Sequence, residues 1–122
     1  MSDSAPQEYR IEWHSGTLVV IPNGDIESMK WDLIDQAADV VMTPIEDTTT
    51  PLVIFDLSEV DYFGSVFLSL LLKCYKAIKP RGGEMVLCAA SPMAAELLQI
   101  TSLHKLWTIY ETREQASEAL GD

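Results

Sequence analysis

Ser65 lies where a hydroxyl group could accept phosphate. Gly64 and Ser65 come directly before a stretch with helical periodicity, which predicts Ser65 at the N-terminus of a helix. The free backbone N–H groups and the dipole at such an end favour an anion. A phosphoryl group there would add roughly two negative charges to the exposed surface. The same position suits a plain N-cap, whose oxygen accepts a hydrogen bond from the helix itself. The spacing leaves both roles open.

Asp56 ends a continuous apolar run that begins at Leu52. Open α/β sheets place their sites at strand ends of this kind, and the phosphoaccepting aspartate of a receiver domain has a comparable position. A receiver domain also needs an acidic pair after its first strand and a lysine after a late strand, and residues 9–22 and 84–90 do not end in this way. We therefore expect Asp56 to tether the loop that follows it. A receiver domain or a small enzyme is kept as an alternative function for the chain.

The other reactive side chains do not form a site. His14 falls on the polar face of an alternating segment and His104 in a connecting segment, so both are predicted at the surface. Cys74 and Cys88 lie within apolar patterns without the spacing of paired ligands, which is typical of core residues in a reducing compartment. No glycine-rich phosphate loop or nucleophile elbow is present. The sequence therefore predicts no enzyme activity, no metal site and no cofactor.

The elements that must position Ser65 and Asp56 are a buried strand and the helix that follows it. The strand, Leu52 to Phe55, shows no polar alternation, which predicts cover on both faces of its sheet. The helix begins at Gly64-Ser65 and stops before Pro80. Its predicted core stripe comprises Leu68, Leu71, Leu72, Tyr75 and Ile78, and its polar stripe comprises Ser69, Lys73 and Lys76.

The rest of the chain predicts further strands and helices around this unit. An alternating strand with Tyr9, Ile11 and Trp13 facing inward forms a hairpin with residues 17–22. A helix of about four turns is predicted after Asn23-Gly24, with an apolar face of Met29, Leu33, Ala37, Val40 and Val41. After the central helix come a strand over 84–88, a helix capped by Ser91, a strand over 106–110 and a helix opened by Thr112. This β-β-α-β-α-β-α-β-α order predicts one α/β domain over residues 8–122, with a mixed, mostly parallel sheet covered by helices. Residues 1–7 are predicted to be a flexible tail.

Charge narrows the class of partner. Eight basic and nineteen acidic residues give the 122-residue chain a formal charge of −11. This argues against a nucleic acid or an anionic membrane as partner, because basic side chains dominate such binding. Half of the basic residues lie on or just after the central helix, namely Lys73, Lys76, Lys79 and Arg81. No apolar run is long enough for membrane insertion and no leader pattern is present, so we expect a soluble cytoplasmic protein.

Four segments together resemble one known family. They are Asn23-Gly-Asp-Ile-Glu27, Asp56-Leu-Ser-Glu-Val60, Leu97-Leu-Gln-Ile-Thr-Ser-Leu103 and Glu114-Gln-Ala116. In this order and on these elements they resemble STAS domains, and within them the bacterial anti-sigma-factor antagonists, over residues 9–120. The resemblance implies a partner-switching role, in which the domain binds an anti-sigma factor that is also a serine kinase and is released when that kinase phosphorylates it. It places the partner-binding surface at Asp25, Glu27, Gly64, Ser65, Ser69 and Lys73.

The chain departs from the family at the phosphoacceptor. The family motif at the start of the central helix is Asp-Ser-Ser/Thr-Gly, whereas this chain has Gly64-Ser65-Val66-Phe67. Val66 therefore occupies the usual acceptor position and cannot be phosphorylated. Either Ser65 is the acceptor, or the domain is a phosphorylation-independent STAS scaffold subunit of a transporter-associated or multi-protein signalling complex. The sequence also leaves open whether the domain forms a homodimer.

Overall fold

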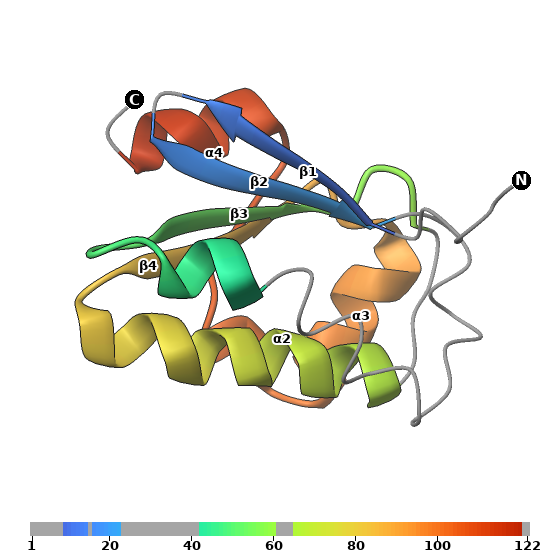
Figure 1. Cartoon of the computed structure of the whole chain (residues 1–122). Coiled ribbons are helices and arrows are strands. Elements are labelled where there is room, and N and C mark those ends of the chain that lie inside the picture. Colours follow the sequence, from blue (N-terminus) through green and yellow to red (C-terminus); the bar gives the residue numbers. More distant parts are fainter. Residues whose placement is uncertain (1–8, 15, 23–41, 61–64, 121–122) are drawn as a thin grey trace, which may run out of the picture.

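A five-stranded sheet with helices on both faces forms the centre of the fold (Figure 1). The computed structural model describes residues 9–14, 16–22, 42–60 and 65–120. The strands are β1 (Tyr9–His14), β2 (Thr17–Pro22), β3 (Leu52–Asp56), β4 (Glu84–Cys88) and β5 (Ile109–Tyr110). The helices are α2 (Ser65–Ile78), α3 (Pro92–Ile100), α4 (Arg113–Ala119) and the 3-10 turns η3 (Lys79–Arg81) and η4 (Leu103–Lys105), and residues 42–46 are also helical.

The sheet is mixed and its strands lie in sequence order, β1-β2-β3-β4-β5. β1 and β2 form the predicted antiparallel hairpin, with Gly16 at φ +86° in the turn. The pairings from β2 to β5 are all parallel. The predicted α/β class with a mixed, mostly parallel sheet is confirmed. The parallel strands all present their carboxyl ends at one edge of the sheet, where Asp56 lies.

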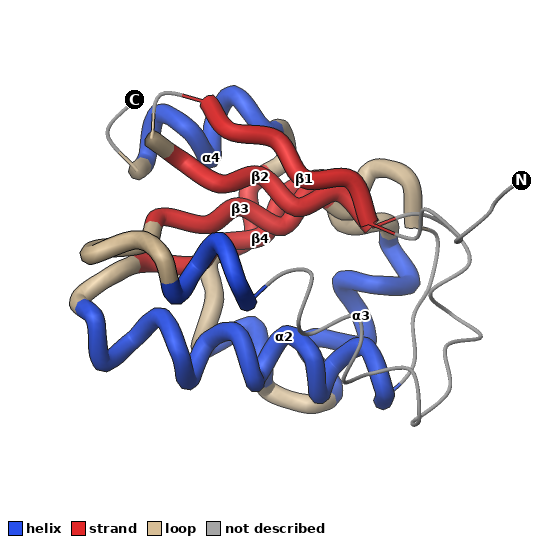
Figure 2. Tube along the Cα trace, in the orientation of Figure 1, coloured by secondary structure: helices blue, strands red, loops and turns tan. Residues whose placement is uncertain are grey.

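The two faces of the sheet carry separate apolar cores. Alternate residues of β2 divide between them, because Leu18 and Val20 join the larger core and Val19 and Ile21 the smaller one. The larger core is covered by α2 and α3, and α4 covers the smaller core through contacts with β3, β4 and β5 (Figures 1 and 2). The absence of polar alternation in β3 thus reflects cover on both faces, as predicted.

Helix α2 packs as its pattern predicts, with a wider buried face. Leu68, Leu71 and Ile78 are buried, and Leu72 and Tyr75 are partly buried. Phe67, Leu70 and Cys74 are fully buried as well, which extends the core stripe around the helix. On the polar stripe, Lys73 and Lys76 are exposed and Ser69 is partly buried.

Two predictions about the edge strands are wrong. Trp13 was expected to face inward, but 52% of it is exposed, because β1 is the outermost strand and lies beyond the helices that cover the sheet. The last strand was expected over 106–110, but β5 contains only Ile109 and Tyr110. Residues 106–108 follow η4 without strand structure, and Trp107 is buried in the core, where its ring meets that of Tyr75 edge-on at 5.9 Å.

The predicted helix caps after β4 are confirmed. Ser91 Oγ accepts a hydrogen bond from Ala94 N (3.1 Å), with Pro92 at the first helical position. Thr112 Oγ1 likewise accepts from Gln115 N (3.1 Å) at the start of α4. The predicted helix after Asn23-Gly24 and the tail over residues 1–7 lie outside the described residues. In the part of the chain that the structure describes, no helix is long and apolar enough to cross a membrane.

Candidate functional site

Asp56 ties the end of β3 to two other parts of the chain. The residue is only 4% exposed. Its Oδ1 accepts a hydrogen bond from Ser58 N (2.9 Å), which confirms the predicted tether of the following loop. Its Oδ2 lies 3.3 Å from Nε of Arg113, the first residue of α4. The sequence did not predict this ion pair, because nothing in the local pattern of either segment indicates that they meet.

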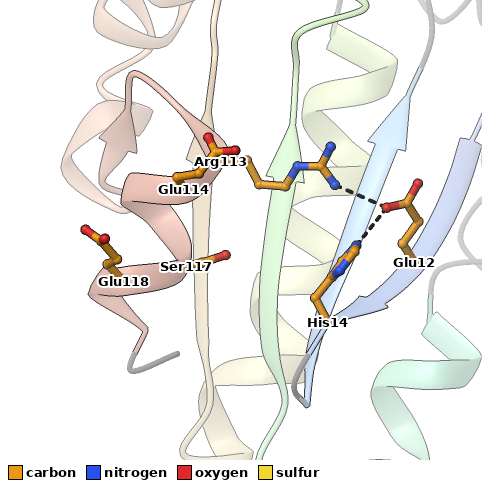
Figure 3. Close-up of a pocket in the computed structure, with 6 residues that line it drawn as sticks. All are labelled: Glu12, His14, Arg113, Glu114, Ser117 and Glu118. Carbon is orange, nitrogen blue, oxygen red and sulfur yellow. Dashed lines mark hydrogen bonds and ion pairs between the residues drawn. The ribbon is translucent and has the colours of Figure 1, made fainter.

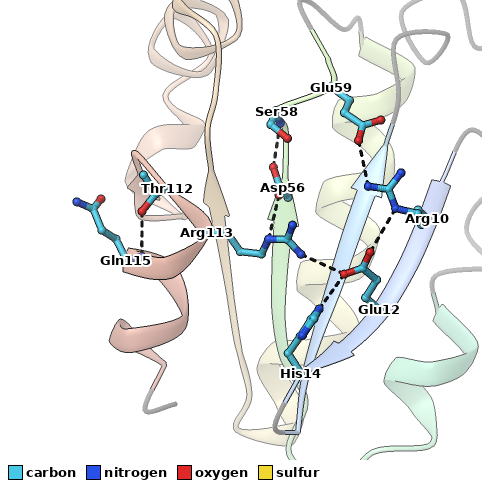
Figure 4. A network of polar contacts seen from close by, with 9 residues as sticks. All are labelled: Arg10, Glu12, His14, Asp56, Ser58, Glu59, Thr112, Arg113 and Gln115. Atoms are coloured by element: carbon cyan, nitrogen blue, oxygen red, sulfur yellow. Dashed lines mark hydrogen bonds and ion pairs between the residues drawn. The ribbon is translucent and has the colours of Figure 1, made fainter.

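From Arg113 a chain of charged side chains crosses the sheet to β1 (Figure 4). Arg113 Nη1 donates to Glu12 Oε1 (3.2 Å), and His14 Nε2 lies 2.8 Å from the same oxygen. Arg10 Nε donates to Glu12 Oε2 (3.3 Å) and Arg10 Nη2 donates to Glu59 Oε2 (3.0 Å). We call these residues, Arg10, Glu12, Asp56, Glu59 and Arg113, the charged brace. Both of its ends, Asp56 and Glu59, belong to the connection that leads from β3 to α2.

The position of β1 explains why the charged brace can form. Arg10, Glu12 and His14 alternate along β1 and therefore point to one face of the sheet. This is the face that carries the smaller core, where the main contacts of α4 are with β3, β4 and β5. The Arg113 side chain extends from α4 toward Glu12 (Figure 3). The brace thus links α4 to β1 across β3 on this face of the sheet.

An open groove of about 470 Å³ lies between β1 and α4 (Figure 3). It is lined by Glu12, His14, Arg113, Glu114, Ser117 and Glu118. Its central cation, Arg113, already contacts two carboxylates, those of Glu12 and Asp56. These two contacts tie α4 to β1 and β3 across the groove. We therefore assign it a structural role.

The pKa shifts of Glu12 and Arg10 agree with this structural role. The pKa of Glu12 lies below its ordinary value, first because of the hydrogen bond with His14 and then because of those from Arg10 and Arg113. The pKa of Arg10 is raised, chiefly by its hydrogen bond to Glu59. Both shifts favour the charged forms at neutral pH. Glu12 and Arg10 therefore take part in the brace as charged partners.

The thiols and imidazoles are placed as the sequence predicts. Cys74 and Cys88 are buried, and burial raises the pKa of each thiol to about 12. Neither thiol is therefore a nucleophile at neutral pH. His14 and His104 are exposed, and His104 Nδ1 lies 3.3 Å from Leu98 O. Among the described residues, no group of His, Cys, Asp and Glu could hold a metal ion.

The predicted partner surface is described only in part. Asp25, Glu27 and Gly64 lie outside the described residues, as do the side chains of Ser65 and Val66. Ser65 is the first residue of α2, whereas the sequence predicted it as the cap just before the helix, a difference within the usual uncertainty of helix ends. Ser69 and Lys73 lie on this helix, one partly buried and one exposed.

The basic residues near α2 lie in two different elements, η3 and α2 itself. Arg81, in η3, donates through Nη1 to the carbonyl oxygens of Glu46 (2.8 Å) and Thr48 (3.3 Å), so it fixes the segment before β3. Lys73 and Lys76 project from the helix itself and are exposed. Of the basic residues that the sequence grouped together, these two lysines are therefore the ones that α2 presents at its surface.

An apolar patch on α3 was not predicted as a surface. Met93 is 57% and Ile100 73% exposed, and with Glu96 and Leu97 they line a shallow hollow of about 230 Å³. The opposite side of α3 is buried through Ala94 and Leu98. The signal was present in the sequence, because this helix is apolar on nearly all sides and a helix that covers a sheet turns one side outward. The patch lies on the α2 side of the sheet.

Three comparisons with known proteins agree with this architecture. A family model described as the STAS domain matches residues 11–116. The chain is 27% identical to the anti-sigma F factor antagonist of Paenibacillus polymyxa, over 89% of this chain and 91% of that protein. Its structure is similar to an anti-sigma-factor antagonist (STAS) domain protein from Planctomyces limnophilus, with a TM-score of 0.83, 27% identity and coverage of 93% of this chain and 98% of that one. It is also similar to an anti-sigma factor antagonist from Mycobacterium paratuberculosis, with a TM-score of 0.74, 28% identity and coverage of 98% and 99%.

Proposed function

Because the chain belongs to the STAS domain family, we propose that it acts as an anti-sigma-factor antagonist, a protein-interaction domain that binds an anti-sigma factor. Similarity to antagonists extends over most of the chain, both in sequence and in structure. The domain carries out no reaction of its own in this proposal. It works by occupying the anti-sigma factor and so freeing a sigma factor for transcription.

The exposed lysines of α2 are the observation that carries the choice of surface. The chain has a net charge of −11, and Lys73 and Lys76 project from a helix on this acidic body. Complementary charges steer association and suppress wrong partners. The proposed surface therefore comprises Ser65, Ser69 and Lys73 on α2, together with Asp25, Glu27 and Gly64, and it meets an acidic face of the partner.

The charged brace supports this choice, because it holds the described residues that follow β3 on the way to α2. Asp56 and Glu59 are its two ends, and Leu57 N donates to Cys88 O (2.9 Å) between them. Val60 N in turn donates to Leu57 O (3.1 Å). A surface held in its binding geometry loses less conformational entropy when a partner docks. We infer that the brace pre-organises the approach to Ser65.

The partner in this proposal is a serine kinase as well as an anti-sigma factor, and Ser65 is its candidate substrate. A phosphoryl group on Ser65 would place negative charge at the start of α2, where it would oppose an acidic partner and release it. Val66, at the family's acceptor position, instead favours a second function: a phosphorylation-independent scaffold in a transporter-associated or multi-protein signalling complex. In that case the same surface binds its partner without a switch.

Recovery of the chain from its native cells, with bound proteins identified by mass spectrometry, tests the proposal. An anti-sigma factor that carries a kinase domain is the expected partner, and the purified pair should form a stable complex. Incubation of that pair with ATP then decides whether Ser65 is phosphorylated. Recovery of transporter subunits, with no anti-sigma factor, would support the scaffold and contradict the antagonist role.

A further inference from the structure

Within the described part of the chain, the outer edge of β1 is unpaired. β1 is the last strand on its side of the sheet and pairs with β2 over all six of its residues. The two-residue connection after His14 closes on a hydrogen-bonded pair, as such hairpins do, so Arg10, Glu12 and His14 direct their backbone groups to β2. Residues 9, 11 and 13 therefore direct theirs outward. Among the described residues, no strand pairs with this edge.

β1 lacks the usual protections of an edge strand. It contains no proline or lysine, and its register with β2 is unbroken by any bulge. Its charged side chains form ion pairs across the face of the sheet with one another, with Glu59 and with Arg113. They therefore do not block pairing of the edge with another strand. Trp13, a large apolar side chain, is 52% exposed here. An edge of this kind is a template for another strand.

The sequence of β1 is complementary to itself. In an antiparallel pair of β1 strands, the outward groups of residues 9, 11 and 13 allow Ile11 to face Ile11 of a second copy, with a two-fold axis between them. Arg10 then lies opposite Glu12 of the second copy, and Trp13 opposite its Tyr9. Opposite charges and aromatic pairs are the cross-strand neighbours that stabilise antiparallel sheets.

The two neighbouring registers are unfavourable. A shift of two residues in one direction places Glu12 opposite Glu12, and the same shift in the other direction places Arg10 opposite Arg10. Like charges directly opposite each other destabilise a strand pair. A shift by one residue would place the outward backbone groups of one copy opposite residues of the other copy whose backbone groups already bond to β2. Of these registers, the one centred on Ile11 satisfies both the backbone and the charges.

We propose that two copies of this chain pair through the outer edges of β1 into one continuous sheet across a two-fold axis. α2 contacts β4, so Ser69 and Lys73 of the proposed partner surface lie on a helix away from the outer edge of β1. A contact of one short strand buries less than the roughly 1,600 Å² of a standard interface. The dimer is therefore reversible and depends on protein concentration.

Two charge reversals test the register directly. Arg10→Glu places glutamates opposite each other, and Glu12→Arg places arginines opposite each other, so each variant should associate with itself at least about tenfold more weakly than the wild type. Mixed together, the two variants face each other with opposite charges at both positions and should form a heterodimer. Lys105→Glu and Glu96→Arg change the net charge by the same amounts at exposed positions away from β1 and should leave dimerisation unchanged. Analytical ultracentrifugation measures all of these equilibria.

Amide hydrogen exchange provides a second measurement that does not depend on Glu12→Arg folding correctly. In the wild type, protection of the Ile11 and Trp13 amides should rise with protein concentration, while that of the Arg10 and Glu12 amides, already bonded to β2, should not change. Arg10→Glu should abolish the rise. A wild type that stays monomeric up to its solubility limit would overturn the proposal. So would unchanged dimerisation of Arg10→Glu, or a mixture of folded variants that does not associate.

Discussion

Arg113 Nε lies 3.3 Å from Asp56 Oδ2, so the first residue of α4 is ion-paired with the last residue of β3. Asp56 is buried, and its other carboxylate oxygen holds Ser58 N. The C-terminal helix thereby contributes to the geometry of the connection that leads into α2. This relationship joins the part of the fold farthest along the chain to the start of the proposed partner surface.

Arg113→Ala should destabilise the domain by about 1–3 kcal/mol, because it leaves a buried carboxylate without its cation. The Arg113 side chain is about one-third exposed, which keeps the effect below that of a fully buried pair. Urea unfolding measures the loss. Glu114→Ala, an exposed neighbour on the same helix, is the control and should stay within about 0.5 kcal/mol of wild type. Equal effects for the two variants would contradict the importance of the ion pair.

Leu71→Ala should cost about 2–5 kcal/mol of unfolding free energy, the usual range for a leucine in a packed core. Leu71 is fully buried in the larger core. Leu106→Ala is the matched control, since Leu106 is exposed and should change stability far less. Denaturant titration of both variants decides the matter. A loss well under about 1 kcal/mol for Leu71→Ala would mean that the buried face of α2 is wrongly assigned.

Stability should fall in acid partly through Glu12. A carboxyl whose pKa is lowered by folding contributes stability above its unfolded-state pKa, here near 4.5, and loses it as pH falls through the folded-state pKa. Glu12→Gln should therefore lower stability at neutral pH and make the acid limb of the stability profile shallower. Unfolding titrations from neutral pH to below 4.5 measure this limb. Parallel profiles for variant and wild type would show that the contacts of Glu12 with His14, Arg10 and Arg113 contribute nothing.

Ser65→Asp separates a cap from a phosphoacceptor. Aspartate caps helices about as well as serine, so folding should be nearly unchanged in either case. If Ser65 only caps α2, partner binding should stay near the wild-type value, whereas a working acceptor predicts that the carboxylate mimics phosphate and weakens the complex. Because Val66 stands at the family's acceptor position, we expect the first result. Substantial phosphate on Ser65 in protein from native cells would contradict it.

The parts of the fold that the sequence predicts well are those with long, regular patterns. β3 and α2 have unbroken apolar and helical periodicity, and both begin and end close to the predicted residues. The edge strands were harder to predict, because the burial of their residues depends on which other elements cover them. Trp13 alternates like a buried residue but lies beyond the helices, and the segment around Trp107 gives up strand pairing to bury that ring beside Tyr75.

The predicted site illustrates the same limit. Ser69 and Lys73 could be assigned to one helix from spacing alone, and the tether at Asp56 from its place at a strand end. The charged brace could not be predicted, because its pairs join β1, β3 and α4, which are distant along the chain. No local pattern encodes such contacts. They arise only once the sheet brings the three elements together.

Binding of the purified domain to the anti-sigma factor recovered with it tests the central claim most directly. Lys73→Glu reverses an exposed charge on α2, and Lys105→Glu makes the same change away from that helix. Calorimetric titration should show that Lys73→Glu weakens the complex at least about tenfold, since it replaces an attractive charge by a repulsive one at the interface. Lys105→Glu should bind like the wild type. Equal affinities for all three proteins, with folding intact, would contradict an antagonist that binds through α2.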